Sequence, residues 1–246
     1  MYLKGTERLL IKSRSLIFTV IYNLSAIFYG ALSVLLIPLP LRFRHKIIIS
    51  WTTFAVFLAR VICGVRYRVI GAENLPARGK SVIVMSKHQS TWETLFLQGL
   101  FWPASTVLKR ELLHIPFFGW GLAALRPIPI DRDNPRAALK LVKQKSVHRL
   151  NSGYNVLLFP EGTRVAAGTK GKYARSGADI AIASSTPIVP VAVNSGLFWP
   201  PKDFKKKPGC ITVAIGPAIS PEGKTSKALI LEVENWIEST MDTLKP

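Results

Sequence analysis

The sequence predicts an α/β fold: a mixed, largely parallel sheet of about seven strands flanked by helices, preceded by a two-helix membrane-associating motif. Two observations lead to this prediction. From residue 66 onward, short runs of β-branched residues alternate with helix-like stretches, which is typical of a sheet whose strands are connected by helices. Before residue 66, two long apolar runs carry almost no charge. We therefore divide the chain into a helical pair, residues 1–65, and one α/β domain, residues 66–246.

The two apolar runs, residues 16–37 and 47–65, are long enough to form membrane helices. The first run carries no charged residue, and a helix of its length would be about 33 Å long, which matches the hydrocarbon core of a bilayer. A cleaved signal peptide is disfavoured, because the run exceeds the usual length of about 7–15 residues and no small-residue cleavage site follows it.

Basic residues before, between and after the runs favour a helix pair that dips into one leaflet. If either run crossed the membrane, one basic cluster would lie on the outer side, contrary to the positive-inside rule. A pair in one leaflet keeps all three clusters in the same headgroup layer. A true span remains the alternative. The clusters are Lys4, Arg8, Lys12 and Arg14, then Arg42, Arg44 and Lys46, then Arg66 and Arg68.

After residue 66, runs rich in β-branched residues predict the strands, and the longer stretches between several of them predict the helices. One helix has clear end signals: Asn134 as N-cap, Pro135 as its first residue and Gly153 just beyond its end. The strands are expected at residues 66–70, 81–85, 106–108, 127–130, 155–159, 188–193 and 211–215. The helices are expected at residues 91–101, 115–125, 135–150, 176–183 and 226–244.

The composition narrows the class of protein. With 48% hydrophobic residues, the chain has the apolar content of a folded protein and not of a disordered one. The two cysteines make no disulfide framework, and the absence of a Cys/His cluster disfavours a structural zinc site. A net charge of +19 attracts polyanions such as nucleic acid, phosphorylated ligands or anionic lipid. No recognised nucleic-acid-binding motif accompanies that charge.

The first candidate for chemistry is residues 81–93, where a buried-type strand runs into a turn and then a helix. His88 and Glu93 would lie about 140° apart on a continuous helix, so they converge only if His88 lies in the turn before it. Ligand sites in α/β proteins commonly lie at the carboxyl ends of strands, where this turn falls. The alternative is that Ser90 and Glu93 form a capping box and His88 is a polar turn residue. One glutamate can also serve both roles.

The second candidate is residues 155–164, another strand that ends in a turn. Backbone amides near Gly162, together with the guanidinium of Arg164, would suit a phosphate group. The alternative is an ordinary glycine turn followed by a surface arginine. The GxxxxGK[ST] pattern of a Walker loop is absent.

Together these segments resemble the glycerolipid acyltransferase family that includes the 1-acyl-sn-glycerol-3-phosphate (lysophosphatidic acid) acyltransferases, in particular its bacterial members. The resemblance covers roughly residues 66–220 and rests on four blocks in order. They are His88-x4-Glu93, PIPIDR at 127–132, FPEGTR at 159–164 and PIVPVAV at 187–193, and LKREL at 108–112 also fits. The sequence departs from the family pattern in two blocks, since the family usually has aspartate where Glu93 stands, and often glycine and an aromatic residue where Arg126 and Ile128 lie.

The resemblance implies a mechanism without a covalent intermediate. His88 would be the general base that takes a proton from a glycerol hydroxyl, while Glu93 fixes the imidazole tautomer. Arg164 would bind the phosphate of the acceptor, and Glu161 would help to shape the acceptor site. The remaining residues assigned to substrate binding are Lys109, Arg132, Gly162 and Thr163. No metal or organic cofactor is implied.

The implied reaction transfers a fatty acyl group from acyl-CoA or acyl carrier protein to the sn-2 hydroxyl of lysophosphatidic acid, forming phosphatidic acid. The protein would work at a membrane lipid surface, on the cytoplasmic side of the inner membrane, and no nucleic-acid partner is expected. Within the same chemistry, glycerol-3-phosphate or another lysolipid could be the acceptor. The alternatives of a different class are a non-catalytic membrane scaffold and a nucleic-acid-binding protein.

Overall fold

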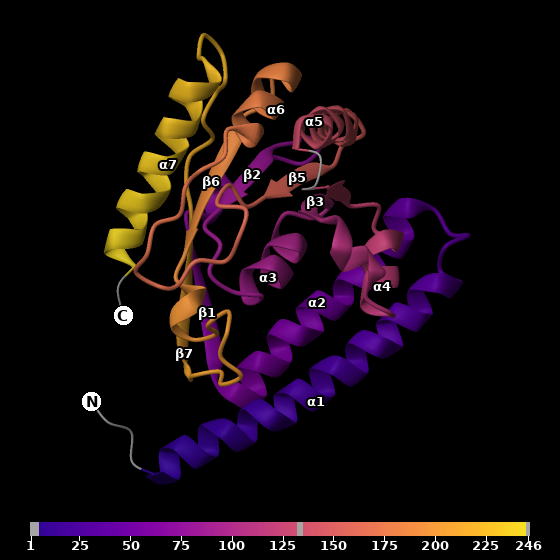
Figure 1. Cartoon of the computed structure of the whole chain (residues 1–246), viewed down its shortest axis with the longest axis vertical. Helices are drawn as coiled ribbons and strands as arrows, with labels where there is room; N and C mark the ends of the chain where they lie inside the picture. The colour runs from indigo at the N-terminus through magenta and orange to yellow at the C-terminus, as the bar shows by residue number, and fades with distance from the viewer. Residues whose placement is uncertain (1–4, 132–134, 245–246) are drawn as a thin grey trace.

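The computed structural model describes residues 5–131 and 135–244, which form seven strands and seven α-helices (Figure 1). The strands are β1 (Val65–Ile70), β2 (Ile83–Ser86), β3 (Ala104–Lys109), β4 (Ile128–Ile130), β5 (Asn155–Leu158), β6 (Ile188–Val193) and β7 (Gly209–Ile215). The helices are α1 (Gly5–Leu35), α2 (Leu41–Cys63), α3 (Trp92–Leu100), α4 (Phe118–Ala124), α5 (Pro135–Asn151), α6 (Ser176–Ser184) and α7 (Ser226–Thr243). Every strand and helix predicted after residue 66 is present.

The strands form one sheet in the order β1-β7-β6-β2-β5-β3-β4. The five strands from β6 to β4 are mutually parallel, whereas β7 is antiparallel to β6 and β1 is parallel to β7. The sheet is therefore mixed and largely parallel, and the predicted fold class is confirmed. Within the parallel part β2 is internal, since Ile83 pairs with Val156 of β5 and with Ile188 of β6. The chain that leaves the carboxyl end of β2 thus emerges between two neighbouring strands.

Helices cover both faces of the sheet (Figure 1). Because successive side chains of a strand point to opposite faces, β2 contributes to two separate cores. Val84 joins the core that includes side chains of α1, α2 and α3, whereas Ile83 and Met85 join the core with α5, α6 and α7. Fully burying side chains of this size stabilises a fold by about 1.5–3 kcal/mol each. The two cores together hold the end of β2 in place.

The two apolar runs form α1 and α2, and both helices are long and apolar enough to cross a bilayer. Half of the most apolar part of α2 is buried, against 17% for α1. α1 packs on α2 and α4, and along its outer side it leaves a stripe of large apolar side chains exposed. The stripe includes Leu10, Ile17, Val20, Leu24, Ile27, Phe28 and Leu35. Steps of three, four and seven residues place these side chains on one helical face.

Some helix ends differ from the predicted ones. The first two helices begin earlier than the apolar runs, at Gly5 and Leu41, because a helix continues through charged residues that an apolar run excludes. α4 begins three residues later than predicted. Ile115 precedes Pro116 and is extended, with a ψ of 119°, and a residue before proline avoids the helical region. The predicted N-cap of α5, Asn134, lies outside the described residues.

Candidate active site

The turn between β2 and α3 brings His88 and Glu93 together. β2 ends at Ser86 and α3 begins at Trp92, so His88 lies in the turn and Glu93 in the first turn of the helix. His88 Nδ1 lies 2.8 Å from Glu93 Oε1. The two side chains meet because the chain bends between them, which a continuous helix would not allow.

The carboxylate of Glu93 is fully buried and is held by hydrogen bonds on both oxygens. Besides the contact with His88, Oε1 accepts hydrogen bonds from the backbone N–H of Gln89 (2.9 Å) and of Ser90 (2.7 Å). Oε2 accepts one from the hydroxyl of Ser195, in the segment after β6 (2.7 Å). The bond to the Ser90 amide is one half of a capping box. Glu93 therefore supports the start of α3 and orients the imidazole at the same time.

Glu93 holds the imidazole ring of His88 along one edge, and Phe159 packs against one face of it. A carboxylate only accepts hydrogen bonds, so Nδ1 carries the proton and Nε2 is the basic nitrogen. The ring stacks on Phe159, which follows β5, with centroids 4.1 Å apart and an interplanar angle of 21°. The side chain is 12% exposed, so the held imidazole still reaches the surface. This arrangement suits a general base.

A second carboxylate, that of Glu161, is hydrogen-bonded to the backbone of His88. Oε2 of Glu161 accepts a hydrogen bond from the N–H of His88 (2.9 Å). Oε1 of Glu161 accepts hydrogen bonds from Lys87 Nζ (2.7 Å) and from the N–H of Gly171 (3.0 Å). The Glu161 side chain is 0% exposed. The structure thus places this predicted site residue inside the fold, where it shapes the turn that carries His88.

Lys87 connects this turn to the last helix of the chain. Its side chain is 1% exposed, and Nζ also donates to Glu238 Oε1 of α7 (2.8 Å) and to the carbonyl of Thr169 (3.1 Å). Tyr173 donates its hydroxyl to the same Glu238 oxygen (2.7 Å), and burial, followed by that hydrogen bond, raises the pKa of Tyr173. The lysine network, which we define as Lys87, Glu161, Glu238 and Tyr173, pairs a buried ammonium with two carboxylates.

The remaining residues of the FPEGTR segment face outward. Gly162, Thr163 and Arg164 are exposed. Gly162 has a φ of +64°, which glycine adopts without strain, and its own N–H is bonded to the Phe159 carbonyl (3.0 Å). Immediately after the segment, the N–H of residue 165 donates to the carbonyl of His88 (2.8 Å). The loop that displays Arg164 is therefore tied directly to the histidine turn.

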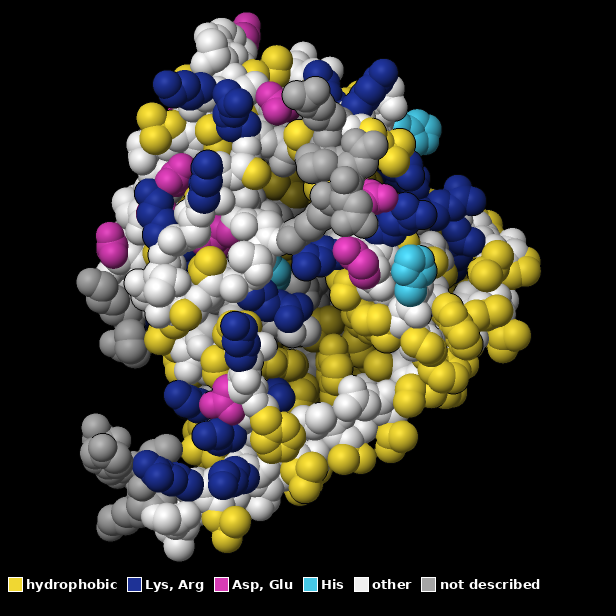
Figure 2. Space-filling view, viewed as in Figure 1, with side chains coloured by type: hydrophobic (Ala, Val, Ile, Leu, Met, Phe, Trp, Pro, Cys, Tyr) yellow, Lys and Arg dark blue, Asp and Glu magenta, His cyan; other side chains and the backbone are white. Residues whose placement is uncertain are grey.

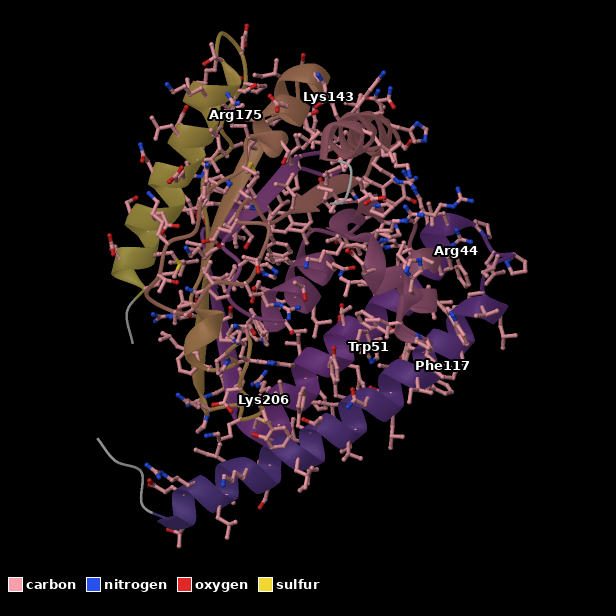
Figure 3. The ribbon with its side chains drawn as sticks, viewed as in Figure 1. Arg44, Trp51, Phe117, Lys143, Arg175 and Lys206 are labelled. Carbon is pink, nitrogen blue, oxygen red and sulfur yellow. The ribbon has the colours of Figure 1, made fainter. Side chains whose placement is uncertain are left out.

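A hydrophobic hollow lies beside these elements. Figure 2 shows it over α2, between α3 and α4, with Lys and Arg side chains along its upper edge. Trp51 of α2 lies in this region (Figure 3). Burial raises the pKa of Tyr22, on α1, to about 12, and the positive charge of Arg164 opposes that shift. Basic groups beside an apolar surface match the chemistry of a ligand with a phosphate and a hydrocarbon chain.

The other two predicted phosphate contacts are less central. Lys109 is the last residue of β3 and is exposed at the carboxyl end of that strand, on the same side of the sheet's strands as His88 but two strands away from β2. Arg132 lies outside the described residues. Within residues 5–131 and 135–244, no group of three His, Cys, Asp or Glu side chains is placed to hold a metal ion.

Four residues of the site escaped the sequence analysis: Lys87, Tyr173, Ser195 and Glu238. Lys87 had a signal, since it is a charged residue that directly follows a mostly apolar strand and precedes the candidate histidine. Ser195 and Glu238 had none, because their partners lie 102 and 151 residues away in the chain.

Comparisons with known proteins place the chain among related sequences. A family model described as acyltransferase matches residues 66–194, which include both candidate segments. The chain is 44% identical to a 1-acyl-sn-glycerol-3-phosphate acyltransferase of Pseudomonas aeruginosa, over 95% of this chain and 92% of that one. It is 30% identical to a protein of the same name from Saccharomyces cerevisiae, over 89% and 72% of the two chains. In fold it is similar to the crystal structure of the 1-acyl-sn-glycerophosphate (LPA) acyltransferase PlsC from Thermotoga maritima, with a TM-score of 0.78, 22% identity and 98% of each chain covered.

Proposed function

The chain belongs to the acyltransferase family, and we propose that it transfers a fatty acyl group from an acyl thioester to the sn-2 hydroxyl of 1-acyl-sn-glycerol-3-phosphate, forming phosphatidic acid. The observation that carries the proposal is the 2.8 Å contact between His88 Nδ1 and Glu93 Oε1 at the carboxyl end of an internal strand. The names of the two similar sequences support this choice of acceptor.

In the proposed mechanism, Nε2 of His88 takes the proton of the acceptor hydroxyl as its oxygen attacks the thioester carbonyl carbon. The new C–O bond gives a tetrahedral intermediate, the C–S bond then breaks, and the imidazolium returns its proton to the leaving thiolate. Glu93 stabilises the imidazolium while it exists. A positioned base of this kind contributes about 10²–10⁴-fold in rate. No residue forms a bond to the acyl group.

The acceptor phosphate is assigned to the outward-facing part of the FPEGTR segment. The guanidinium of Arg164 can form two parallel hydrogen bonds to phosphate oxygens. Thr163 adds a hydroxyl beside it, and Gly162 permits the turn that exposes both. Lys109, at the carboxyl end of β3, is assigned to the same ligand, and so is Arg132. Glu161 acts on the site through the backbone of His88, to which it is bonded.

The helix pair is assigned to one leaflet on the cytoplasmic side of the inner membrane. Half of the apolar part of α2 is buried against the protein, so that helix does not face lipid all round as a lone span would. α1 exposes its apolar stripe on one side only, which suits a helix lying in the plane of the interface. The donor, acyl-CoA or acyl carrier protein, is anionic in either form and is attracted by the net charge of +19.

Thiol release by the detergent-purified protein tests the proposal. Acyl-CoA and acyl carrier protein donors are combined with lysophosphatidic acid, glycerol-3-phosphate or another lysolipid. We expect release with lysophosphatidic acid, and a loss of about 10²–10⁴-fold in His88→Ala. His114→Ala is the matched control, because His114 is exposed in the segment before α4. Equal rates in wild type and His88→Ala, or no release with any pair, would contradict the proposal and favour a non-catalytic scaffold.

A further inference from the structure

Four arginines from three segments meet at the end of the helix pair. Arg42 and Arg44 lie in the first turn of α2, Arg126 follows α4, and Arg149 lies in the last turn of α5. We call these four residues the arginine cluster. Figure 3 labels Arg44 at this end of the molecule.

Contacts between the three segments bring the four side chains to the same place. Nη2 of Arg149 donates to the carbonyl of Arg126 (3.1 Å). Nη2 of Arg42 lies 3.2 Å from the position that a Cβ on Gly153 would take, and Gly153 is the second residue after α5. The charges of Arg44 and Arg149 both interact with that of Arg126. The cluster is therefore a feature of the tertiary structure and not a run in the sequence.

The cluster holds like charges together, with no neutralising carboxylate among the described residues. In the part of the chain that the structure describes, none of its arginines forms an ion pair with a carboxylate. Burial, and then the charge of Arg126, lowers the pKa of both Arg44 and Arg149. Arg44 is only 5% exposed, and its Nε has no hydrogen-bond partner among the described residues. An unsatisfied buried donor among repelling cations is the pattern of an anion site.

The surroundings of the cluster indicate where the anion comes from. Nη1 of Arg44 donates to the carbonyl of Ile37 (2.8 Å), in the turn between α1 and α2. That turn exposes the apolar side chains of Ile37 and Leu39, and the first turn of α2 exposes Phe43. In Figure 2, Lys and Arg side chains gather directly above a hydrophobic surface at the right-hand end of the molecule, where Figure 1 places this turn. An apolar surface below guanidinium groups matches the layering of a lipid leaflet, with chains below and phosphates above.

The cluster is separate from the proposed acyl-transfer site. Arg126 and Arg149 lie just before β4 and β5, so they are at the amino ends of these parallel strands. His88 lies just after β2, at the carboxyl end of a strand in the same parallel part of the sheet. The cluster and His88 are thus at opposite ends of these strands. A phosphate bound at the cluster is therefore not the phosphate of the reacting acceptor.

We propose that the arginine cluster binds the phosphate of an anionic phospholipid of the membrane surface, with the α1–α2 turn lying against its acyl chains. The guanidinium groups hold the phosphate oxygens, and the orphaned Nε of Arg44 gains an acceptor. The site anchors the sheet domain at the end of the helix pair that is farthest from the N-terminus. This inference concerns membrane binding and does not depend on which acceptor is acylated.

The test measures lipid binding to the full chain in uncharged detergent micelles. The immobilised protein is titrated with fluorescent phosphatidylglycerol, and unlabelled phosphatidylglycerol, phosphatidylcholine and inorganic phosphate serve as competitors. We expect Arg126→Gln/Arg149→Gln to weaken binding of phosphatidylglycerol by roughly 10- to 30-fold. The control is Lys140→Gln/Lys143→Gln, which removes the same charge from exposed positions of α5 and should change binding by less than about twofold.

Each outcome of the titration decides the proposal. Competition by phosphatidylglycerol but not by phosphatidylcholine, with loss only in the arginine variant, supports it. Equal losses in both double variants would assign the binding to overall charge and overturn it. Competition by inorganic phosphate as strong as that by phosphatidylglycerol would overturn the lipid assignment in favour of a free anion. Normal lipid binding with reduced use of acyl-CoA or acyl carrier protein would overturn it in favour of a donor site. The single variant Arg149→Gln replaces the double one if the latter does not fold.

Discussion

Two glutamates of α7, one helical turn apart, form ion pairs in very different surroundings. Glu234 meets Lys170, whose side chain is 55% exposed (2.7 Å). Glu238 meets Lys87, whose side chain is 1% exposed (2.8 Å). Water and salt screen the first pair, and holding two mobile side chains together offsets much of its attraction. In the second pair the lysine is buried and Glu238 is 20% exposed, so water screens the pair less, and breaking it leaves the charge of Lys87 in the interior.

The two pairs show that the N–O distance alone does not identify an important ion pair. The pair of Lys87 and Glu238 is also the one that is connected to the proposed general base. Lys87 precedes His88, and both Lys87 Nζ and the His88 amide donate to Glu161. We therefore expect Lys87 and Glu238 to be positioning residues for His88, and the pair one turn away to be dispensable. The following variants test that contrast in order of expected effect.

The largest effect is expected at Glu93, whose carboxylate is fully buried. Glu93→Ala removes the acceptor for His88 Nδ1 and for the amides of Gln89 and Ser90, so kcat should fall by about 10²–10⁴-fold. Glu93→Asp keeps the carboxylate one methylene shorter and should retain most of the rate. Thiol release by both variants is the measurement. Equal losses would mean that the carboxylate supports the turn and does not act through the imidazole.

Lys87→Met should have the next largest effect. It leaves Glu161 and Glu238 facing each other without the cation between them, and breaking a buried pair costs about 3–5 kcal/mol. Thermal unfolding in detergent should show this loss, and kcat should fall because the Glu161 carboxylate that holds the His88 amide loses its hydrogen bond from Lys87. Lys87→Arg restores the charge and should recover part of both. A Lys87→Met variant with wild-type Tm and kcat would remove Lys87 from the positioning role.

Glu238→Gln should have a moderate effect. The amide still accepts a hydrogen bond from Lys87 or Tyr173 but loses the charge, which lowers stability by about 1–3 kcal/mol. We expect kcat to fall several-fold while KM for the acceptor changes by less than about twofold, because the phosphate contacts lie elsewhere. A rise in KM with unchanged kcat would argue that α7 affects acceptor binding and not the position of His88.

Glu234→Gln should have the smallest effect. Its partner is exposed, so we expect Tm and kcat to match those of the wild type within the error of the measurement. The variant is the matched control for Glu238→Gln, because it makes the same chemical change on the same helix. Losses of equal size in Glu234→Gln and Glu238→Gln would mean that burial of the lysine partner does not make one ion pair more important than the other.

Much of the architecture was predictable because it depends on local patterns. Runs such as residues 188–193 are continuously apolar and rich in β-branched residues, as in a buried strand, and β6 formed at those residues. The helix ends were less predictable, as α4 shows, because a proline and its preceding residue override the apolar pattern. The meeting of His88 and Glu93 was predictable in outline, since a strand, a turn and a helix start lie within thirteen residues of sequence.

By itself, the sequence determined the α/β class, the apolar helix pair, the two motif segments and the resemblance that they carry. Each of these depends on residues that are close together in the chain, whose spacing is read by the period of a strand or a helix. Only the tertiary structure decided that Glu161 bonds to the His88 amide and that Glu238 of α7 bonds to Lys87. The same holds for the arginine cluster, in which the charges of Arg44 and Arg149 interact with that of Arg126. These contacts depend on how helices pack on the two faces of the sheet. No local period encodes that packing, because it is set by burial of apolar side chains that come from the whole chain.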